Sequence, residues 1–209
     1  MIAAPATPAA EIRILALGDS YTIGEGVSVD DRWPMQLAAA LRARGSSVAT
    51  PTIVARTGWT TDELSAGVDD ARPTGQFDAV TLLIGVNNQY RGRSVDEYRS
   101  QFRDLLARAI QFAGGRATRV IVVSIPDWGV TPFAEGRDRA RIAHDIDAFN
   151  GVSRDEATRV GARYVDVTAI SRRAAAERDL IGEDQLHPSP GMYAAWVRLM
   201  LPVVLAAIA

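Results

Sequence analysis

The chain has 209 residues, of which 47% are hydrophobic and 23% charged, a balance typical of one soluble globular domain. Its formal net charge of -2 favours neither nucleic acid nor an anionic membrane surface as a partner. The sequence contains no Cys and no Lys, which excludes disulfides, thiolate metal sites, Cys nucleophiles and Lys-based catalysis.

Residues 1–10 are rich in Ala and Pro, and they lack the basic segment and long apolar core of an intact signal peptide. We expect a disordered lead there, followed by a single domain over residues 11–209. The expected location is the cytoplasm, or the periplasm or medium if the lead is a processed remnant. The apolar segment 196–209 contains Arg198 and Pro202 and is too short to span a bilayer, so no stable membrane insertion is expected. The oligomeric state stays open.

Short apolar runs alternate along the chain with patterns typical of amphipathic helices. The predicted strands cover residues 12–17, 48–55, 78–84, 120–125 and 164–167. Helices are predicted over residues 34–44, after Thr60, after Ser94, around residues 142–160, after residue 167 and after Ser189. Capping signals mark three of these starts: Thr60 with Glu63, Ser94 with Glu97, and Ser189 with Pro190.

This alternation predicts a three-layer α/β/α sandwich around a mostly parallel sheet of five strands. The expected strand order is flavodoxin-like, 2-1-3-4-5. Residues 21–32, between the first strand and the first helix, are predicted to form a loop.

Small polar residues and glycines follow several of the predicted strands. Ser20 follows the first, Gly58 the second and Asn87 the third, while Asp184 and His187 lie on the last loop. In a parallel sheet with right-handed crossovers, the strand ends meet at one edge, so we expect these residues to lie together. Hydroxyl, imidazole, carboxylate and N–H donors are the groups that serine-hydrolase chemistry requires.

The spacing of Asp184 and His187 suits a carboxylate–imidazole pair. Pro188 disfavours the helical region for His187, so the two side chains are expected on an extended loop or turn. There the carboxylate of Asp184 can fold back to the Nδ1 atom of His187.

Four sequence blocks, in order along the whole chain, resemble those of the SGNH (GDSL) hydrolases, an esterase- and lipase-like family. They are Gly18-Asp-Ser-Tyr21, Gly58, Gly85-Val-Asn-Asn88 and Asp184-x-x-His187. The resemblance implies Ser20 as nucleophile, His187 as base and Asp184 as orienting acid. It also implies an oxyanion hole made of the Ser20 and Gly58 N–H groups and the Asn87 side chain.

Two positions depart from the family pattern. Tyr21 stands in place of the Leu of the family name, and Asn88 stands where many members have Asp. The second departure puts in doubt any role of that carboxylate, but none of Asn87.

Competing sites are weaker. His144 is the other possible base, but its helix position points it away from the apolar stripe, as a solvated histidine would lie. With two His and no Cys, no metal site is expected and no cofactor is implied. The Gly-x-Ser-x-Gly elbow of α/β-hydrolases is absent.

The expected activity is hydrolysis of a small-molecule carboxylic ester through an acyl-enzyme on Ser20. Two alternatives use the same residues, an acyltransferase and a carbohydrate O-deacetylase, and a third is a non-catalytic flavodoxin-like domain that binds a small ligand. Aromatic residues near the edge loops are candidate walls of a substrate pocket, although packing explains each equally well: Tyr21, Trp59, Tyr90 and Trp128, with Phe133 and Tyr193 as further members.

Overall fold

A computed structural model of the protein describes residues 11–209, and the predicted lead over residues 1–10 lies outside them. The described part contains one sheet of parallel strands in the order β2-β1-β3-β4-β5. The strands are β1 (Ile14–Gly18), β2 (Thr52–Ala55), β3 (Ala79–Leu83), β4 (Val120–Val123) and β5 (Arg163–Val165). The predicted α/β class and strand order are confirmed.

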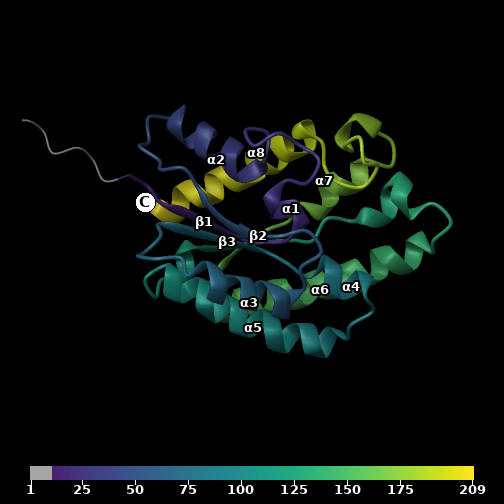
Figure 1. The fold of residues 1–209 in the computed structure, drawn as a ribbon, viewed down its shortest axis with the longest axis horizontal. Helices are drawn as coiled ribbons and strands as arrows, with labels where there is room; N and C mark the ends of the chain where they lie inside the picture. Colours follow the sequence, from purple (N-terminus) through teal and green to yellow (C-terminus); the bar gives the residue numbers. More distant parts are fainter. Residues whose placement is uncertain (1–10) are drawn as a thin grey trace, which may run out of the picture.

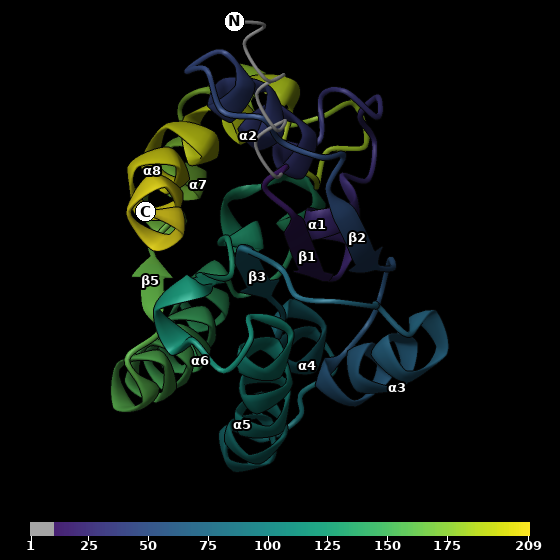
Figure 2. The ribbon, with the colours of Figure 1, turned by 90° about the vertical axis from the view of Figure 1, so that its left-hand side faces the viewer.

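Helices cover both faces of the sheet (Figures 1 and 2). They are α1 (Ser20–Ile23), α2 (Trp33–Arg42), α3 (Thr61–Ala71), α4 (Val86–Tyr90), α5 (Val95–Phe112), α6 (Arg139–Val160), α7 (Thr168–Arg173) and α8 (Pro190–Ile208). Short 3-10 helices are η1 (Ala117–Arg119), η2 (Trp128–Val130), η3 (Pro132–Ala134) and η4 (Arg178–Leu180). Helices α2, α7 and α8 lie on one face, and α3, α5 and α6 on the other.

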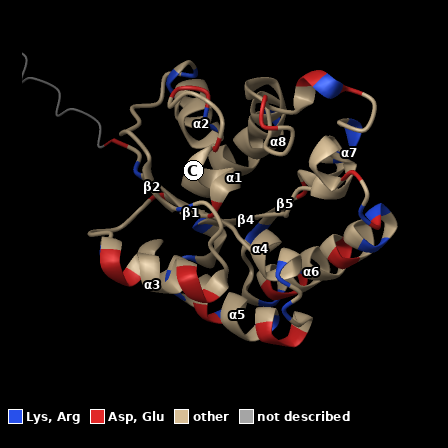
Figure 3. Cartoon of the chain, turned by 45° about the vertical axis from the view of Figure 1, so that its right-hand side comes forward, with Lys and Arg blue, Asp and Glu red and all other residues tan. Residues whose placement is uncertain are grey.

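The central strands are buried on both faces. Every residue of β1, β3 and β4 is buried, which explains why these strands appear as continuous apolar runs rather than alternating ones. Charged residues lie mainly on the helices and loops, and acidic and basic residues are interspersed along α5 and α6 (Figure 3).

The three predicted capping signals form in the structure. The Glu63 carboxylate accepts the Thr60 N–H at 2.9 Å and completes the capping box of α3. The Ser94 hydroxyl accepts an N–H at the start of α5, and the Ser189 hydroxyl does the same for α8. Local hydrogen-bonding chemistry therefore fixes where these helices begin.

The predicted loop over residues 21–32 is wrong at its start, where the short helix α1 begins directly after β1. Asp19 caps this helix by accepting the Tyr21 N–H, and Gly24, in the left-handed region, ends it. Four residues are too few to show a helical hydrophobic period. The predicted second strand is also too long, because Pro51 separates β2 from Val48, which forms only an isolated bridge to Ile12.

The apolar C-terminal segment lies in α8, which begins at Pro190 as predicted, so the judgement that it is too short to span a bilayer is wrong by length. Helix α8 has 19 residues and is the one helix, within residues 11–209, that is long and apolar enough to cross a membrane by length and composition. Half of its most apolar window is buried inside the fold, where α8 packs against α2 and the sheet. The core helix of an α/β domain has the same composition, so α8 is weak evidence for a membrane span.

Candidate active site

One open cavity of about 190 Å³ collects the predicted polar residues at the carboxyl edge of the sheet. Ser20 follows β1, Gly58 follows β2 and Asn87 follows β3, and all three line this cavity together with His187 from the loop before α8. Since the strands are parallel, their ends share this edge, as the sequence predicted.

Ser20 owes its position to the tight junction of β1 with α1. A Cβ atom at Gly18 would clash with the Thr22 hydroxyl and would lie 2.5 Å from the Leu83 carbonyl oxygen, so a larger residue would push α1 away from β3. Ser20 is the first residue of α1, and its N–H therefore has no acceptor inside the helix. Ser20 therefore lines the cavity with an N–H that the helix leaves unpaired.

Asp184 and His187 form a close pair. Asp184 Oδ2 lies 2.6 Å from His187 Nδ1, while Oδ1 accepts the N–H groups of Leu186 at 3.0 Å and His187 at 2.9 Å. Burial would raise the pKa of Asp184, but the Leu186 N–H and the His187 ring and N–H outweigh it and hold the pKa below its ordinary value. The carboxylate is thus ionised and aligned on one ring nitrogen of His187.

The loop that carries this pair is closed at its base. The Gly182 N–H donates to the His187 carbonyl at 2.7 Å, and Ile181 and Pro188 form an antiparallel bridge. Next to the pair, the Tyr21 ring meets the His187 ring edge-on at 5.4 Å between centroids. No hydrogen bond joins Ser20 to His187 in the part of the chain that the structure describes. Such contacts commonly tighten only when substrate is bound.

Two further residues with N–H donors, Gly58 and Asn87, line the cavity beside Ser20. Gly58 has φ +82°, a left-handed conformation that favours glycine, and within residues 11–209 its N–H makes no hydrogen bond. The Asn87 side chain donates one amide hydrogen to the Trp59 carbonyl oxygen at 3.0 Å. That bond orients the amide and leaves its second hydrogen for a ligand in the cavity.

Asn88 and Arg91 hold the Gly58 segment in place, a role that the sequence did not reveal. Asn88 is fully buried, accepts the Thr61 N–H at 3.1 Å and donates to the Thr61 hydroxyl at 2.7 Å. An Arg91 guanidinium nitrogen lies 2.6 Å from the Gly58 carbonyl oxygen. Residues 58–61 are therefore held against α4 by contacts at both of their ends.

The rest of the cavity wall is apolar and aromatic. Among the predicted wall residues, Tyr21, Tyr90, Trp128 and Phe133 line the cavity, and they are joined there by residues that the sequence did not single out: Thr57, Val86 and Leu186. The Trp59 ring instead packs on Gly67 of α3, and Tyr193 is buried in the core.

A family model for the GDSL-like lipase/acylhydrolase family matches residues 16–195. The chain belongs to this family. The match includes Ser20, Gly58, Asn87, Asp184 and His187. No curated protein sequence is significantly similar to the chain.

Solved structures share the fold at low sequence identity. A putative GDSL-like lipase from Parabacteroides merdae is 15% identical with a TM-score of 0.75, over 94% of this chain and 96% of that one. A variant of an acetyl xylan esterase from Geobacillus stearothermophilus is 19% identical with a TM-score of 0.71, over 92% and 94%. A psychrotrophic esterase from Pseudoalteromonas sp., inhibited by monoethylphosphonate, is 17% identical with a TM-score of 0.68, over 93% and 97%.

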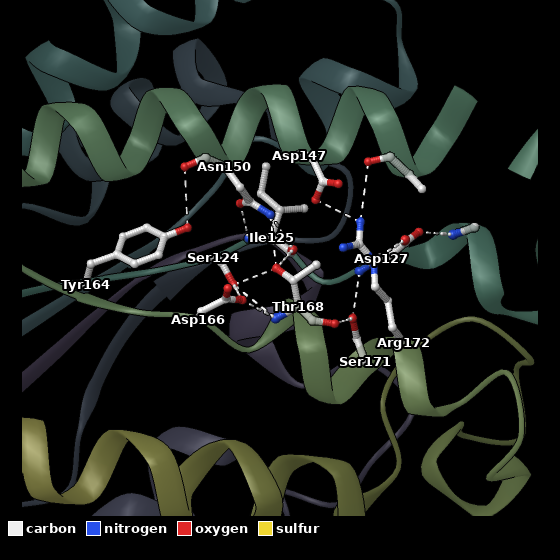
Figure 4. Close-up of polar contacts among 12 residues, drawn as sticks. Ser124, Ile125, Asp127, Asp147, Asn150, Tyr164, Asp166, Thr168, Ser171 and Arg172 are labelled. Atoms are coloured by element: carbon white, nitrogen blue, oxygen red, sulfur yellow. Dashed lines mark hydrogen bonds and ion pairs between the residues drawn. The ribbon is translucent and has the colours of Figure 1, made fainter. Parts of the chain in front are cut away.

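In this GDSL-family chain, the loop that carries Trp128 is fixed by a polar network at the end of β4 (Figure 4). Asp127 pairs with Arg172 of α7 at 2.9 Å, accepts the Gly129 N–H and donates its own N–H to Ser171. Arg172 reaches on to Asp147 of α6 at 2.8 Å. The segment that carries Trp128 is therefore held by polar contacts that extend to both α6 and α7.

Among residues 11–209, no group of three His, Cys, Asp or Glu side chains could hold a metal ion. His144, the alternative base, lies on α6 with 84% of its side chain exposed, and it is outside the cavity.

Proposed function

We propose that the protein is a metal-independent serine ester hydrolase with Ser20 as nucleophile, His187 as base and Asp184 as orienting acid. The single observation that carries the proposal is the 2.6 Å pair of Asp184 and His187 beside a cavity that Ser20 also lines. Membership of the GDSL-like lipase/acylhydrolase family supports it.

In the first half of the proposed reaction, Ser20 Oγ attacks the ester carbonyl carbon and its proton passes to His187 Nε2. The bond from the carbonyl carbon to the alcohol oxygen then breaks, and His187 returns the proton to the leaving alcohol. In the second half, His187 takes a proton from water, which attacks the acyl-enzyme. Ser20 leaves with that proton, and a carboxylic acid is released.

The oxyanion that forms in each half needs hydrogen-bond donors. In this proposal the donors are the N–H groups of Ser20 and Gly58 and the second amide hydrogen of Asn87, and the lining of one cavity by these three residues supports it. Fixed donors of this kind commonly supply much of the rate enhancement in acyl transfer. The fastening of the Gly58 segment by Asn88 and Arg91 supports such a role, because the donors would not need to reorganise during the reaction.

The cavity favours an uncharged substrate. Within residues 11–209, no Arg, Asp or Glu lines it, and the side opposite the polar groups is apolar and aromatic. Tyr90 and Phe133 are 47% and 41% exposed at this wall, so a sugar ring could stack there, which keeps carbohydrate O-deacetylation as a second candidate.

Covalent labelling of the folded protein with a fluorophosphonate tests the proposal. We expect labelling at Ser20 that is lost in Ser20→Ala and in His187→Ala. Ser28→Ala and His144→Ala are matched controls, because both side chains are exposed and outside the cavity, and both should label like the wild type. A folded wild type that stays unlabelled would overturn the proposal and favour the non-catalytic ligand-binding alternative.

A panel of acetylated sugars and alkyl esters then separates the candidate activities, with and without an added alcohol acceptor. Release of free acid from alkyl esters supports the hydrolase. Preference for acetylated sugars supports the deacetylase, and transfer to the added alcohol in place of acid release supports the acyltransferase.

A further inference from the structure

Arg137 lies behind the aromatic wall of the cavity. It is located between η3 and the start of α6, and its guanidinium carbon lies 5.2 Å from the ring centroid of Tyr90, 5.3 Å from that of Trp128 and 5.2 Å from that of Phe133. Its Nη2 atom also donates to the Tyr90 hydroxyl at 3.2 Å. Within residues 11–209 it forms no ion pair, so the three rings and this hydroxyl are its main partners.

The three rings also contact one another. Centroid separations are 5.4 Å for Tyr90 and Trp128, 6.4 Å for Tyr90 and Phe133, and 6.1 Å for Trp128 and Phe133. All three rings line the active-site cavity, whereas Arg137 does not and instead lines a separate outer hollow that Tyr90 and Trp128 share. The rings thus form a wall with the substrate cavity on one side and a cation on the other.

The members of this wall are not equally well fixed. Trp128 is 4% exposed, its indole N–H donates to the Gln89 side chain at 2.9 Å, and the Asp127 network holds its loop. Tyr90 and Phe133 are 47% and 41% exposed, and the one side-chain hydrogen bond of Tyr90 within residues 11–209 is that from Arg137. Arg137 therefore adds, to the direct contacts between the rings, one cation that lies against the two exposed rings and the fixed one.

We propose that Arg137 is a specificity-determining positioning residue that holds this wall closed and so limits the size of the substrate group the cavity accepts. The inference rests on the proposed ester hydrolase function. A cavity of about 190 Å³ is smaller than the roughly 300–1,000 Å³ of pockets that bind drug-sized ligands, which suits a small substrate group. Without the cation, Tyr90 and Phe133 gain rotamer freedom, and the cavity can open toward the outer hollow.

The test is a comparison of wild type and Arg137→Ala on two series of esters. One series varies the acyl chain of p-nitrophenyl esters from acetate to octanoate, and the other varies the alcohol of alkyl acetates. In at least one of the two series, we expect the ratio of kcat/KM for the longest ester to that for the shortest to be about tenfold or more higher in Arg137→Ala than in wild type. The change should come mainly from KM, because the wider cavity accommodates a few more methylene groups. Arg137→Lys keeps a cation near the rings without the planar stacking and should restore part of the discrimination.

Arg154→Ala is the matched control, because Arg154 lies 5.4 Å over the ring of Tyr164, far from the cavity. It removes the same kind of contact and should leave both profiles unchanged. The proposal is overturned if Arg137→Ala keeps the wild-type profile in both series, or if Arg154→Ala changes the profile equally. Fluorophosphonate labelling of Ser20 in wild type and variant reports on the proposed function separately.

Discussion

Asp19 and Glu156 are carboxylates with almost no exposed surface, and their surroundings are opposite. The side chain of Glu156 on α6 is 2% exposed and is held at 2.7–3.0 Å by three guanidinium groups: Arg99, Arg103 and Arg159. Asp19 is fully buried next to Ser20, accepts the Tyr21 N–H on Oδ1 and has no partner for Oδ2 within residues 11–209.

The pKa values follow these surroundings. Hydrogen bonds from Arg103, followed by those from Arg159 and Arg99, outweigh burial and lower the pKa of Glu156 to about 2. Burial raises the pKa of Asp19 to about 7, although the Tyr21 N–H opposes the shift. Glu156 thus has three cationic partners, whereas Asp19, beside the proposed nucleophile, has a partner for only one of its two oxygens within residues 11–209. Unsatisfied polar groups of this kind collect at functional sites.

Asp184 lies in the candidate site like Asp19, but both of its carboxylate oxygens have hydrogen-bond partners, as those of Glu156 do. Changing Asp184 should have the largest effect on activity. Asp184→Asn replaces an acceptor for His187 Nδ1–H with a side chain that can donate, so the imidazole is expected to adopt the wrong tautomer. We expect kcat for ester hydrolysis to fall about 10⁴-fold, as in other triads. Steady-state kinetics measure this.

Asp179→Asn is the control for that experiment, because Asp179 is exposed on the preceding segment and bonds to Ser189 only through its backbone. It should keep wild-type kcat. A kcat for Asp184→Asn within tenfold of wild type would mean that the 2.6 Å contact with His187 does not orient the base.

Asp19→Asn should have the next largest effect, on stability rather than rate. Because the folded-state pKa of Asp19 lies above its unfolded value, its favourable contribution is present below about pH 4 and is lost as the pH rises through about 7. The variant retains the cap acceptor but cannot ionise. Its free energy of unfolding relative to wild type should therefore rise by up to about 4 kcal/mol between pH 4 and pH 8.

Urea titrations across this pH range measure the difference, and Asp70→Asn, at an exposed position on α3, is the control. If the difference in free energy of unfolding between Asp19→Asn and wild type stays constant with pH, the pKa of Asp19 is not raised in the folded protein. The contrast with Glu156 would then disappear.

The polar residues that meet at the candidate site could be predicted from the sequence, while the residues that hold them in place could not. Strand and helix periods, together with cap spacings, are local and place Ser20, Gly58 and Asn87 at strand ends, and a separation of three residues joins Asp184 to His187. The supporting contacts join distant segments, such as Asn88 to Thr61 across 27 positions.

Two residues on the aromatic side of the site likewise have tertiary contacts that could not be predicted from the sequence. The position of Trp59 on an edge loop predicts that it lines the pocket, yet its ring packs on Gly67 of α3. Arg137 has no distinctive sequence pattern, since it is one arginine among 23 and its contacts with three rings from α4, η2 and η3 exist only in the folded chain. Tertiary contacts between loops have no periodic trace in a single sequence.

Glu156→Gln should give the smallest effect and test the satisfied side of the comparison. The folded pKa of Glu156 lies below its unfolded value, so its stabilisation is present above about pH 4.5 and is lost as the pH falls toward 2. Because the Arg side chains are 34–55% exposed, solvent screens these pairs, and we expect a loss of about 1–2 kcal/mol at pH 7. Glu177→Gln, which breaks one exposed pair with Arg173, should cost less. If Glu156→Gln lies as far below wild type at pH 2.5 as at pH 7, in urea titrations at both, its loss comes from packing between α5 and α6 rather than from charge.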